Sequence, residues 1–254
     1  MIVRRIMATE GITISAAFDL VNVGKDIGEV AGIGKIDVPV SDPKDLAEVL
    51  KSSKTEVLLD FTIAAATAVN APVAAGAGVN LIIGTTGLTA EQKTNITEAV
   101  IKNKVAAVIS SNYSIGVGVF FKLCKEAAKN LGLDYDVEII EAHHNQKKDA
   151  PSGTAVRLAE VLCEAADRTS DDLVYGRQGI VGARTRREIG IHAVRGGDIV
   201  GDHTVLFAGD GERIELTHRA SSRMTFAKGA LRAAKWLAGA SAGYYDMQDV
   251  LGLK

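Results

Sequence analysis

Hydrophobic and polar positions follow two different patterns along this chain. In the first half, short runs rich in Val, Ile and Leu alternate with longer stretches of helical periodicity. The runs that predict strands lie at residues 12–18, 56–61, 80–83 and 105–110, and those that predict helices at 63–77, 90–102 and 116–131. Alternation of this kind predicts a parallel sheet with helices on both faces.

The predicted helices carry recognisable end signals. Thr89 and Gln92 have the spacing of a capping box, in which each residue satisfies a backbone donor of the other, so we expect a helix to begin there. Gly132 is a suitable end for the helix before it, because glycine adopts the left-handed conformation that closes many helices.

The rhythm changes after about residue 114. A strand at 137–142 and an amphipathic helix at 154–166 precede three extended stretches, at 188–194, 198–207 and 213–218. The glycine turns Gly196-Gly197 and Gly209-Asp210-Gly211 separate these stretches. We therefore expect a second, α+β domain with a largely antiparallel sheet, followed by a closing helix at 225–237.

Composition restricts the class of protein. The 254 residues are 47% hydrophobic and 24% charged, with a net charge of −2. These values are typical of a soluble globular protein and favour neither a nucleic-acid nor a membrane partner. No apolar run approaches the roughly 20 residues of a membrane span, and the start lacks the apolar core of a signal peptide. Cys124 and Cys163 fall on apolar helix faces, which favours packing roles and a cytoplasmic location.

Residues 141–155, Glu-Ala-His-His-Asn-Gln-Lys-Lys-Asp-Ala-Pro-Ser-Gly-Thr-Ala, are the richest in candidate chemistry. They join the predicted strand at 137–142 to the helix at 154–166. Such a junction exposes backbone N–H groups at the positive end of the helix dipole, where an anion can bind. Imidazole and ammonium groups beside it predict proton transfer to a carboxylate substrate. A polar surface loop with an ordinary Ser cap is the alternative, and a zinc site is disfavoured because further ligands at suitable spacing are lacking.

This run resembles the signature of the dihydrodipicolinate reductase (4-hydroxy-tetrahydrodipicolinate reductase) family. The resemblance covers nearly the whole chain, in the expected order, through five further motifs: Asp60-Phe-Thr62, Gly84-Thr-Thr-Gly87, Asn112-Tyr-Ser114, Gly201-Asp-His-Thr204 and His218-Arg-Ala-Ser-Ser-Arg-Met-Thr-Phe226. It implies a Rossmann-like, doubly wound α/β fold and an oxidoreductase that uses NADH or NADPH to reduce a small dicarboxylate in diaminopimelate and lysine biosynthesis.

The resemblance also implies roles for individual residues. His143 and Lys147 correspond to the family's catalytic proton-transfer pair. The substrate-binding positions are His144, Ser152, Gly153 and Thr154. No metal site is implied. His192, His203 and His218 lie in predicted strands and are expected to be structural, while Arg195 and Arg223 are expected to form surface or interface ion pairs.

Cofactor contacts are expected at the carboxyl ends of the first-half strands, where open α/β sheets bind ligands. The positions are Asp19, Gly84, Thr85, Thr86, Ser111, Asn112, Tyr113 and Ser114. Asp19 would accept hydrogen bonds from the adenosine ribose. Leu20 stands where some family members carry Arg beside a 2′-phosphate, which slightly favours NADH, although Lys25 offers a positive charge nearby.

One part of the family pattern is missing. The chain opens on a predicted helix at residues 2–9, ended by Gly11, with no strand and glycine-rich turn before it. That strand is central in a doubly wound sheet, so its loss would expose unpaired edges. We expect that the natural chain begins roughly 15 residues earlier, with a strand and a turn; the alternative is a variant that has lost tight cofactor binding. A sheet without this strand should show an unfilled position beside residues 12–18 unless another segment fills it.

We therefore expect three parts. Residues 1–114 form the dinucleotide-binding domain, 115–222 the substrate-binding and oligomerisation domain, and 223–254 a C-terminal helix that returns to the first domain. The resemblance implies a homotetramer. Two other functions stay open: a nicotinamide enzyme acting on another small acid, and a cofactor-deficient binding protein of the same fold.

Overall fold

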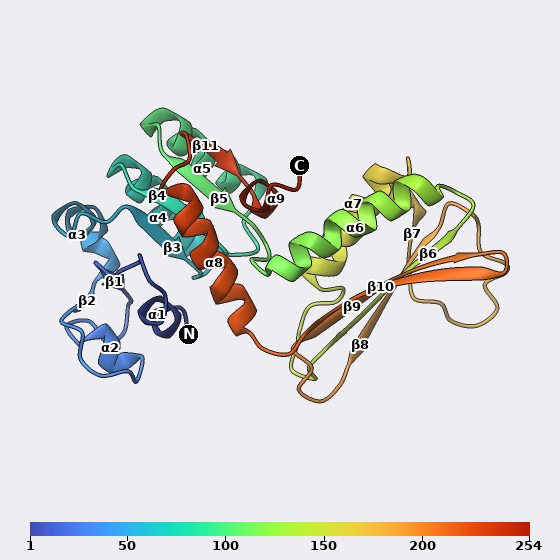
Figure 1. Ribbon diagram of the computed structural model, residues 1–254, viewed down its shortest axis with the longest axis horizontal. Helices are drawn as coiled ribbons and strands as arrows, with labels where there is room; N and C mark the ends of the chain where they lie inside the picture. The colour runs from blue at the N-terminus through green and yellow to red at the C-terminus, as the bar shows by residue number, and fades with distance from the viewer. The chain divides into compact units, whose positions relative to one another are not determined.

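A computed structural model describes all residues, 1–254. Its contacts divide the chain into two compact units, one made of Met1–Ser114 with Met224–Lys254, the other of Ile115–Arg223. Each unit has its own sheet and its own core (Figure 1). None of the helices is long and apolar enough to cross a membrane.

The first unit contains a four-stranded parallel sheet in the order β11-β5-β4-β3. Its strands are β3 (Val57–Asp60), β4 (Asn80–Ile83), β5 (Ala106–Ile109) and β11 (Gly243–Tyr245). Helix α4 (Ala64–Gly76) connects β3 to β4, and α5 (Ala90–Asn103) connects β4 to β5. The alternation of strands and helices predicted for this region is thus confirmed, as is the capping box of Thr89 and Gln92.

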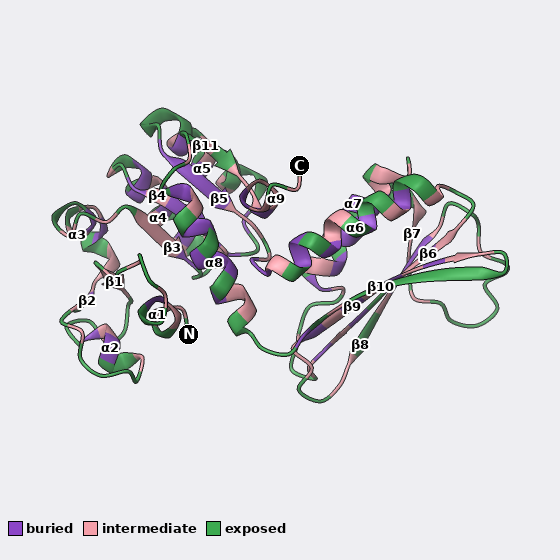
Figure 2. Cartoon of the chain, viewed as in Figure 1, coloured by how far each residue is buried: buried purple, intermediate pink, exposed green.

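Helices cover both faces of this sheet. The apolar side chains of α4, α5 and α3 (Leu46–Ser52) form one buried cluster with the strands. The opposite face is covered by α8 (Met224–Leu237) and α9 (Met247–Leu251), which form a second cluster. Two covered faces explain why the inner strands β4 and β5 are nearly continuous apolar runs, and Figure 2 shows both mostly in the buried colour.

One strand position beside this sheet is open. Strand β1 (Ala17–Phe18) pairs only with β2 (Val40–Ser41), and β3 has no partner on its outer edge. A cavity of about 750 Å³ lies between these two edges, lined mainly by residues 11–20 and 54–63. The expected unfilled position beside residues 12–18 is therefore confirmed.

The backbone of β3 has unpaired hydrogen-bonding groups on the side of the open position. The carbonyls of Glu56 and Asp60 accept hydrogen bonds from the N–H groups of Asn80 and Gly84, so they face β4. Successive strand residues face opposite sides, so the N–H and C=O groups of Val57 and Leu59 face the cavity. With no strand paired on this side, only two of the residues predicted at 12–18 form a strand.

The N-terminal region contains elements that the sequence pattern did not reveal. Helix α1 (Ile2–Met7) is close to the prediction, whereas α2 (Ile27–Val30) lies in a segment for which no helix was predicted. Asp26 caps α2 by accepting the N–H groups of Gly28 and Glu29. A Cβ on Gly28 would lie 2.2 Å from the carbonyl oxygen of Gly34, so the chain needs glycine there.

The second unit is built on a five-stranded sheet in the order β10-β9-β6-β8-β7. The strands are β6 (Asp136–His143), β7 (Leu173–Tyr175), β8 (Ile189–Arg195), β9 (Gly201–Gly209) and β10 (Glu212–Ala220). Strand β9 is antiparallel to β6 and β10, whereas β6, β8 and β7 are parallel. The fold class is as expected, but the sheet is mixed rather than largely antiparallel, because a helical crossover leads from β6 toward β7 and β8.

Two helices cover one face of this sheet. Helix α6 (Ile115–Leu131) and helix α7 (Gly153–Ala165) form a buried cluster with the strands. Helix α6 stops before Gly132, whose φ of +58° is left-handed, as predicted. The other face is open: Ile140 and Val194 are 40% and 49% exposed, and most of β10 is exposed in Figure 2.

Candidate functional site

The loop from β6 to α7 brings the candidate chemistry of the second unit together. Side chains alternate along β6, so Glu141 and His143 lie on the face that the helices cover, and both are buried. Strand pairing supplies their neighbours: His143 is opposite Arg195 on β8, and Glu141 is opposite His203 on β9.

Glu141 is the centre of this arrangement, with a side chain that is fully buried. Its Oε2 lies 2.6 Å from His143 Nδ1 and accepts a hydrogen bond of 2.9 Å from Arg195 Nη1. Its Oε1 accepts hydrogen bonds from Arg195 Nη2 at 2.9 Å and from the backbone N–H of Ser152 at 3.1 Å. One carboxylate thus connects the imidazole, the arginine and the start of α7.

The charge on Glu141 is stabilised despite burial. Burial alone would raise the pKa of this carboxyl, but the hydrogen bonds from Arg195, His143 and Ser152 outweigh it and hold the pKa below its usual value. Arg195 Nη2 also donates to the carbonyl of Asp149 at 2.8 Å, which fixes the loop before α7. We expected Arg195 to form a surface or interface ion pair; its partner is a buried carboxylate of the site.

Ser152 caps the N-terminus of α7. Its hydroxyl accepts a hydrogen bond from the N–H of Ala155 at 3.2 Å and lies 3.0 Å from His203 Nε2. Gly153 and Thr154 are the first residues of this thirteen-residue helix. The helix dipole and the first-turn N–H groups can attract a carboxylate at this end.

His203 packs edge-on against His143, with ring centroids 5.1 Å apart. Burial, with the nearby His143, lowers the pKa of His203 to about 4, so its ring is neutral at neutral pH. Because it contacts Ser152 and His143, His203 belongs to the inner part of this site. Its Nδ1 is buried without a hydrogen-bond partner.

The other candidates lie farther along the loop. Lys147 forms an ion pair of 2.8 Å with Asp149, and its side chain is only 19% exposed. His144 Nε2 accepts a hydrogen bond from Arg223 Nη2 at 3.3 Å. Lys148 is exposed. We expected Arg223 to form a surface or interface ion pair; it is exposed, and it donates to His144, a proposed substrate-binding residue.

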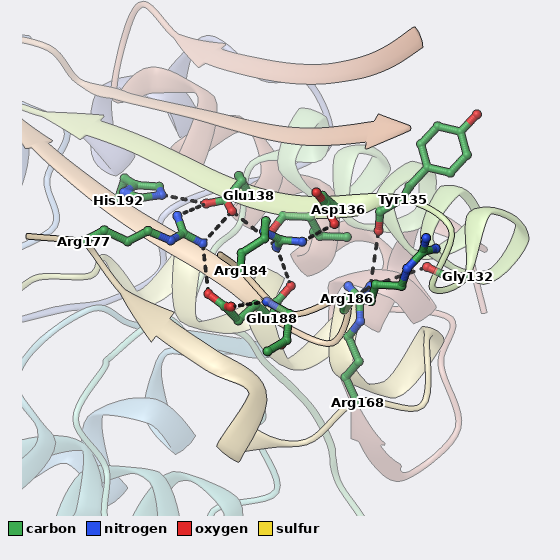
Figure 3. A network of polar contacts seen from close by, with 12 residues as sticks. Gly132, Tyr135, Asp136, Glu138, Arg168, Arg177, Arg184, Arg186, Glu188 and His192 are labelled. Atoms are coloured by element: carbon green, nitrogen blue, oxygen red, sulfur yellow. Dashed lines mark hydrogen bonds and ion pairs between the residues drawn. The ribbon is translucent and has the colours of Figure 1, made fainter. Parts of the chain in front are cut away.

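A second glutamate–arginine–histidine group, drawn in Figure 3, lies on the opposite face of β6, because Glu138 and Glu141 are three positions apart along the strand. Glu138 accepts hydrogen bonds from Arg177 at 2.8 and 3.0 Å and lies 2.7 Å from His192 Nε2. Arg184 lies 3.3 Å from the same carboxylate. This network contacts none of the loop residues from 143 to 154, so it is structurally separate from the candidate site.

In the first unit, the residues after β3 and β4 form a polar cluster. Asp60 Oδ1 accepts hydrogen bonds from the N–H and hydroxyl of Thr62, at 3.0 and 2.6 Å, and from the hydroxyl of Thr85 at 3.3 Å. Asp60 Oδ2 is buried and unpartnered. Gly84 packs against the Phe61 ring so closely that a Cβ would lie 2.1 Å from it. Thr86 follows these residues and is exposed.

The turn after β5 has a buried side, formed by Tyr113, and an exposed side, formed by Ser111. The Tyr113 hydroxyl donates to the carbonyls of Ile83 and Val108 from a buried position, and burial raises the pKa of this phenol. The N–H of Ser114 donates to Asn112 Oδ1 at 2.8 Å, while Ser111 is exposed. Tyr113 therefore shapes this turn through its hydroxyl, and Ser111 and Asn112 offer the accessible groups.

Asp19 is exposed at the end of β1, on the rim of the open cavity, and Leu20 beside it is 83% exposed. The ends of β3, β4 and β5 carry the buried Asp60 carboxylate, threonine hydroxyls and the close-packed Gly84. Between β1 and β3 there is a cavity where a dinucleotide fold has its first strand.

Glu141, Arg195, His203 and Asp60 are the polar groups that sequence reasoning did not select. Arg195 and His203 lie more than 50 residues from Glu141 in sequence and reach it through strand pairing. A signal was present for Glu141: it precedes His143 by two positions, the spacing that places two strand side chains on one face.

Comparisons with known proteins give a consistent result. The family models "Dihydrodipicolinate reductase, N-terminus" and "Dihydrodipicolinate reductase, C-terminus" match residues 1–113 and 116–251. The 4-hydroxy-tetrahydrodipicolinate reductase of Methanococcoides burtonii is 62% identical over 252 residues, 99% of this chain and 94% of that protein. That of Methanocaldococcus jannaschii is 55% identical over 256 residues, 99% of this chain and 92% of that protein. A dipicolinate-bound dihydrodipicolinate reductase structure from Paenisporosarcina is 27% identical, with a TM-score of 0.76, covering 97% of this chain and 92% of that one.

Proposed function

The chain belongs to the dihydrodipicolinate reductase family, and on this premise we propose that the loop from β6 to α7 is where it reduces its substrate. The reaction converts 4-hydroxy-tetrahydrodipicolinate to tetrahydrodipicolinate with a nicotinamide cofactor, in diaminopimelate and lysine biosynthesis. Each turnover releases water and consumes one hydride and one proton. When bound, the dihydronicotinamide supplies the hydride, so the protein must bind the ring and supply the proton.

His143 is the proposed proton donor and acceptor, and Lys147 a second donor. The main observation that supports this assignment is the position of the buried Glu141 carboxylate. Its Oε2 lies 2.6 Å from His143 Nδ1, and its Oε1 accepts a hydrogen bond of 3.1 Å from the N–H of Ser152. It therefore holds a proton-transferring imidazole close to a helix N-terminus that suits a carboxylate. Imidazole exchanges protons near neutral pH, and the ammonium of Lys147 both donates protons and attracts anions.

The substrate carboxylates are proposed to bind at the start of α7 and beside His144. Gly153 and Thr154 supply first-turn backbone groups, Ser152 and Thr154 supply hydroxyls, and His144, held by Arg223, supplies an imidazole. The Paenisporosarcina reductase is described as dipicolinate-bound, which supports a dicarboxylate ligand for this fold.

Residues 1–114 with the returning 223–254 are proposed to bind the cofactor, and 115–222 the substrate. Gly84, Thr85 and Thr86, with Ser111, Asn112, Tyr113 and Ser114, would hold the nicotinamide end, and Asp19 the adenosine ribose. NADH is the preferred cofactor in this proposal, because Leu20 places no positive charge beside Asp19 and the ammonium of Lys25 is bonded to Asn22. Comparing kcat/KM for NADH and NADPH tests this preference.

A homotetramer and a cytoplasmic location complete the proposal. The open face of the second sheet, with exposed Ile140 and Val194, is the surface through which four copies would associate, and light scattering measures their number. The free thiols of Cys124 and Cys163 are consistent with a reducing compartment.

Replacing His143 tests the catalytic assignment. In His143→Gln, kcat should fall by about 10²–10⁴-fold, the usual range for loss of a general acid or base, while the affinity for NADH is unchanged. Lys148→Gln is the matched control, because Lys148 is an exposed residue of the same loop, and it should keep the wild-type kcat. A near-wild-type kcat for folded His143→Gln would contradict the assignment.

A further inference from the structure

We propose that Glu141 is the positioning residue of this site: its buried carboxylate holds the His143 ring with a proton on Nδ1, which leaves Nε2 as the atom that exchanges a proton with the substrate. This inference rests on the proposed function, because it specifies which atom of the proposed catalytic residue reacts. Glu141 itself is enclosed by protein groups, with no exposed side-chain surface, so it acts through His143 and not on the substrate.

The proton on Nδ1 follows from the charges around Glu141. An ionised carboxylate only accepts hydrogen bonds, and Arg195 donates to both oxygens of this one at 2.9 Å. The pairing of a buried carboxylate with a guanidinium keeps it ionised. A contact of 2.6 Å between Oε2 and Nδ1 therefore requires the proton to be on the nitrogen.

The opposite edge of the His143 ring faces a glycine. Gly201 begins β9, and a Cβ on it would lie 3.0 Å from Nε2 and 3.4 Å from Cδ2 of the ring. Glycine thus leaves room beside the nitrogen that must exchange a proton, while Glu141 holds the other nitrogen. Nδ1 is engaged on the buried side, so the two nitrogens have different roles.

The same carboxylate also sets where the imidazole lies relative to the anion site. Oε1 accepts the N–H of Ser152, whose hydroxyl caps α7, and Oε2 contacts His143. A change at Glu141 would therefore release the ring and the start of the helix together. Precise placement of this kind reduces the reorganisation needed at the moment of proton transfer.

The chain contains a matched control for this role. Glu138 lies on the same strand and also contacts an arginine and a histidine, but on the opposite face (Figure 3). It lies 2.7 Å from His192 Nε2 and has no contact with the β6–α7 loop. If Glu141 contributed only to the stability of the sheet, neutralising either glutamate would have similar consequences for catalysis.

The experiment compares Glu141→Gln with Glu138→Gln. The glutamine amide nitrogen can donate to Nδ1, which would favour the wrong tautomer of His143. We expect kcat to fall by about 10²-fold or more in Glu141→Gln. In serine proteases, a wrong tautomer of the catalytic histidine lowers kcat by up to ~10⁴-fold. The KM for NADH should be unchanged, and Glu138→Gln should keep kcat within about twofold of wild type.

Nitrogen-15 NMR of the His143 ring gives a readout that a purely structural role would not change. In the wild-type protein, the neutral ring should carry its proton on Nδ1, and in Glu141→Gln the population should shift toward Nε2–H. A wild-type ring protonated on Nε2 overturns the inference even if the variant fails to fold. So does a folded Glu141→Gln variant with wild-type kcat and tautomer.

The kinetics of His143→Gln separate this inference from the proposed function. If that variant keeps its kcat, His143 is not the proton donor and the proposed function fails, whatever the ring tautomer. If it loses kcat while Glu141→Gln does not, the proposed function stands and the role of Glu141 is disproved.

Discussion

At the scale of single residues, His203 shows how burial sets the chemistry of the site. It is 3% exposed, lies beside Ser152 and His143, and is neutral because burial lowers its pKa to about 4. A charged ring at this position would repel His143 when the latter carries a proton. Under the proposed function, a neutral His203 therefore does not compete with His143 for proton exchange.

This burial makes stability dependent on pH. The unfolded chain protonates His203 below about pH 6.5, whereas the folded protein does so only near pH 4. The contribution of His203 is thus fully present above pH 6.5 and decreases as the pH falls toward 4, by on the order of 3 kcal/mol over the full range. In His203→Gln, which does not titrate, the free energy of unfolding in urea should depend less on pH in this interval.

Lys148→Gln is the control, because it replaces an exposed loop residue that has no contact with His203, and it should leave this pH dependence nearly as in wild type. Parallel pH profiles for wild type and His203→Gln would show that His203 is not buried as a neutral group.

The residues of the β6–α7 loop differ in how far the sequence could reveal them. His143, Lys147 and Ser152 lie within one run, where titratable groups beside a helix start are visible in the sequence alone. Arg195 and His203 could not be found in this way, because strand register brings them to His143 and Glu141. The sequence shows alternation along a strand but not which strands are neighbours.

At the scale of secondary structure, the first unit is defined by the open position between β1 and β3. Of the strand predicted at 12–18, only Ala17 and Phe18 form one. On the other side of the cavity of about 750 Å³, the backbone groups of Val57 and Leu59 are unpaired. A dinucleotide fold uses the turn after this strand to bind the pyrophosphate. For residues 1–254 alone, the open position should therefore limit the affinity for the cofactor.

Filling the position tests this account. A segment joined before Met1, made of one apolar strand followed by a glycine-rich turn, should raise the affinity for NADH by roughly tenfold or more, which corresponds to about 1.4 kcal/mol. Calorimetry measures both proteins. The free energy of unfolding should also rise, because the new strand satisfies the N–H and C=O groups of both edges.

The control segment has the same length but carries proline at alternate strand positions, so that it cannot donate the ladder hydrogen bonds. It should leave the affinity for NADH unchanged. Equal affinity in all three proteins would mean that the turn after this strand is dispensable for cofactor binding.

Elements with strong periodicity were predictable, and those defined by tertiary pairing were not. Helices α5 and α6 and strand β4 agree with the predictions to within about a residue. Strand β2, with two residues, has too short a pattern to recognise. The mixed order of the second sheet depends on the crossover through α7, which turn signals alone do not show.

At the scale of the whole molecule, the chain divides its chemistry between two units. The first has the parallel sheet whose strand ends carry Asp60, Gly84 and Asn112, and the second has the loop with Glu141 and His143. The family relationship extends over both units, as the matches to residues 1–113 and 116–251 show. Under the proposed function, reduction of the substrate therefore requires both units.

The most direct test of this account is the reaction itself. The protein, shown to be folded by circular dichroism, is mixed with freshly generated 4-hydroxy-tetrahydrodipicolinate and saturating NADH or NADPH, and the loss of absorbance of the reduced nicotinamide is followed. We predict oxidation that depends on the substrate, with tetrahydrodipicolinate as the product and a much lower rate for His143→Gln. Folded protein that oxidises neither nicotinamide in the presence of this substrate would contradict the account.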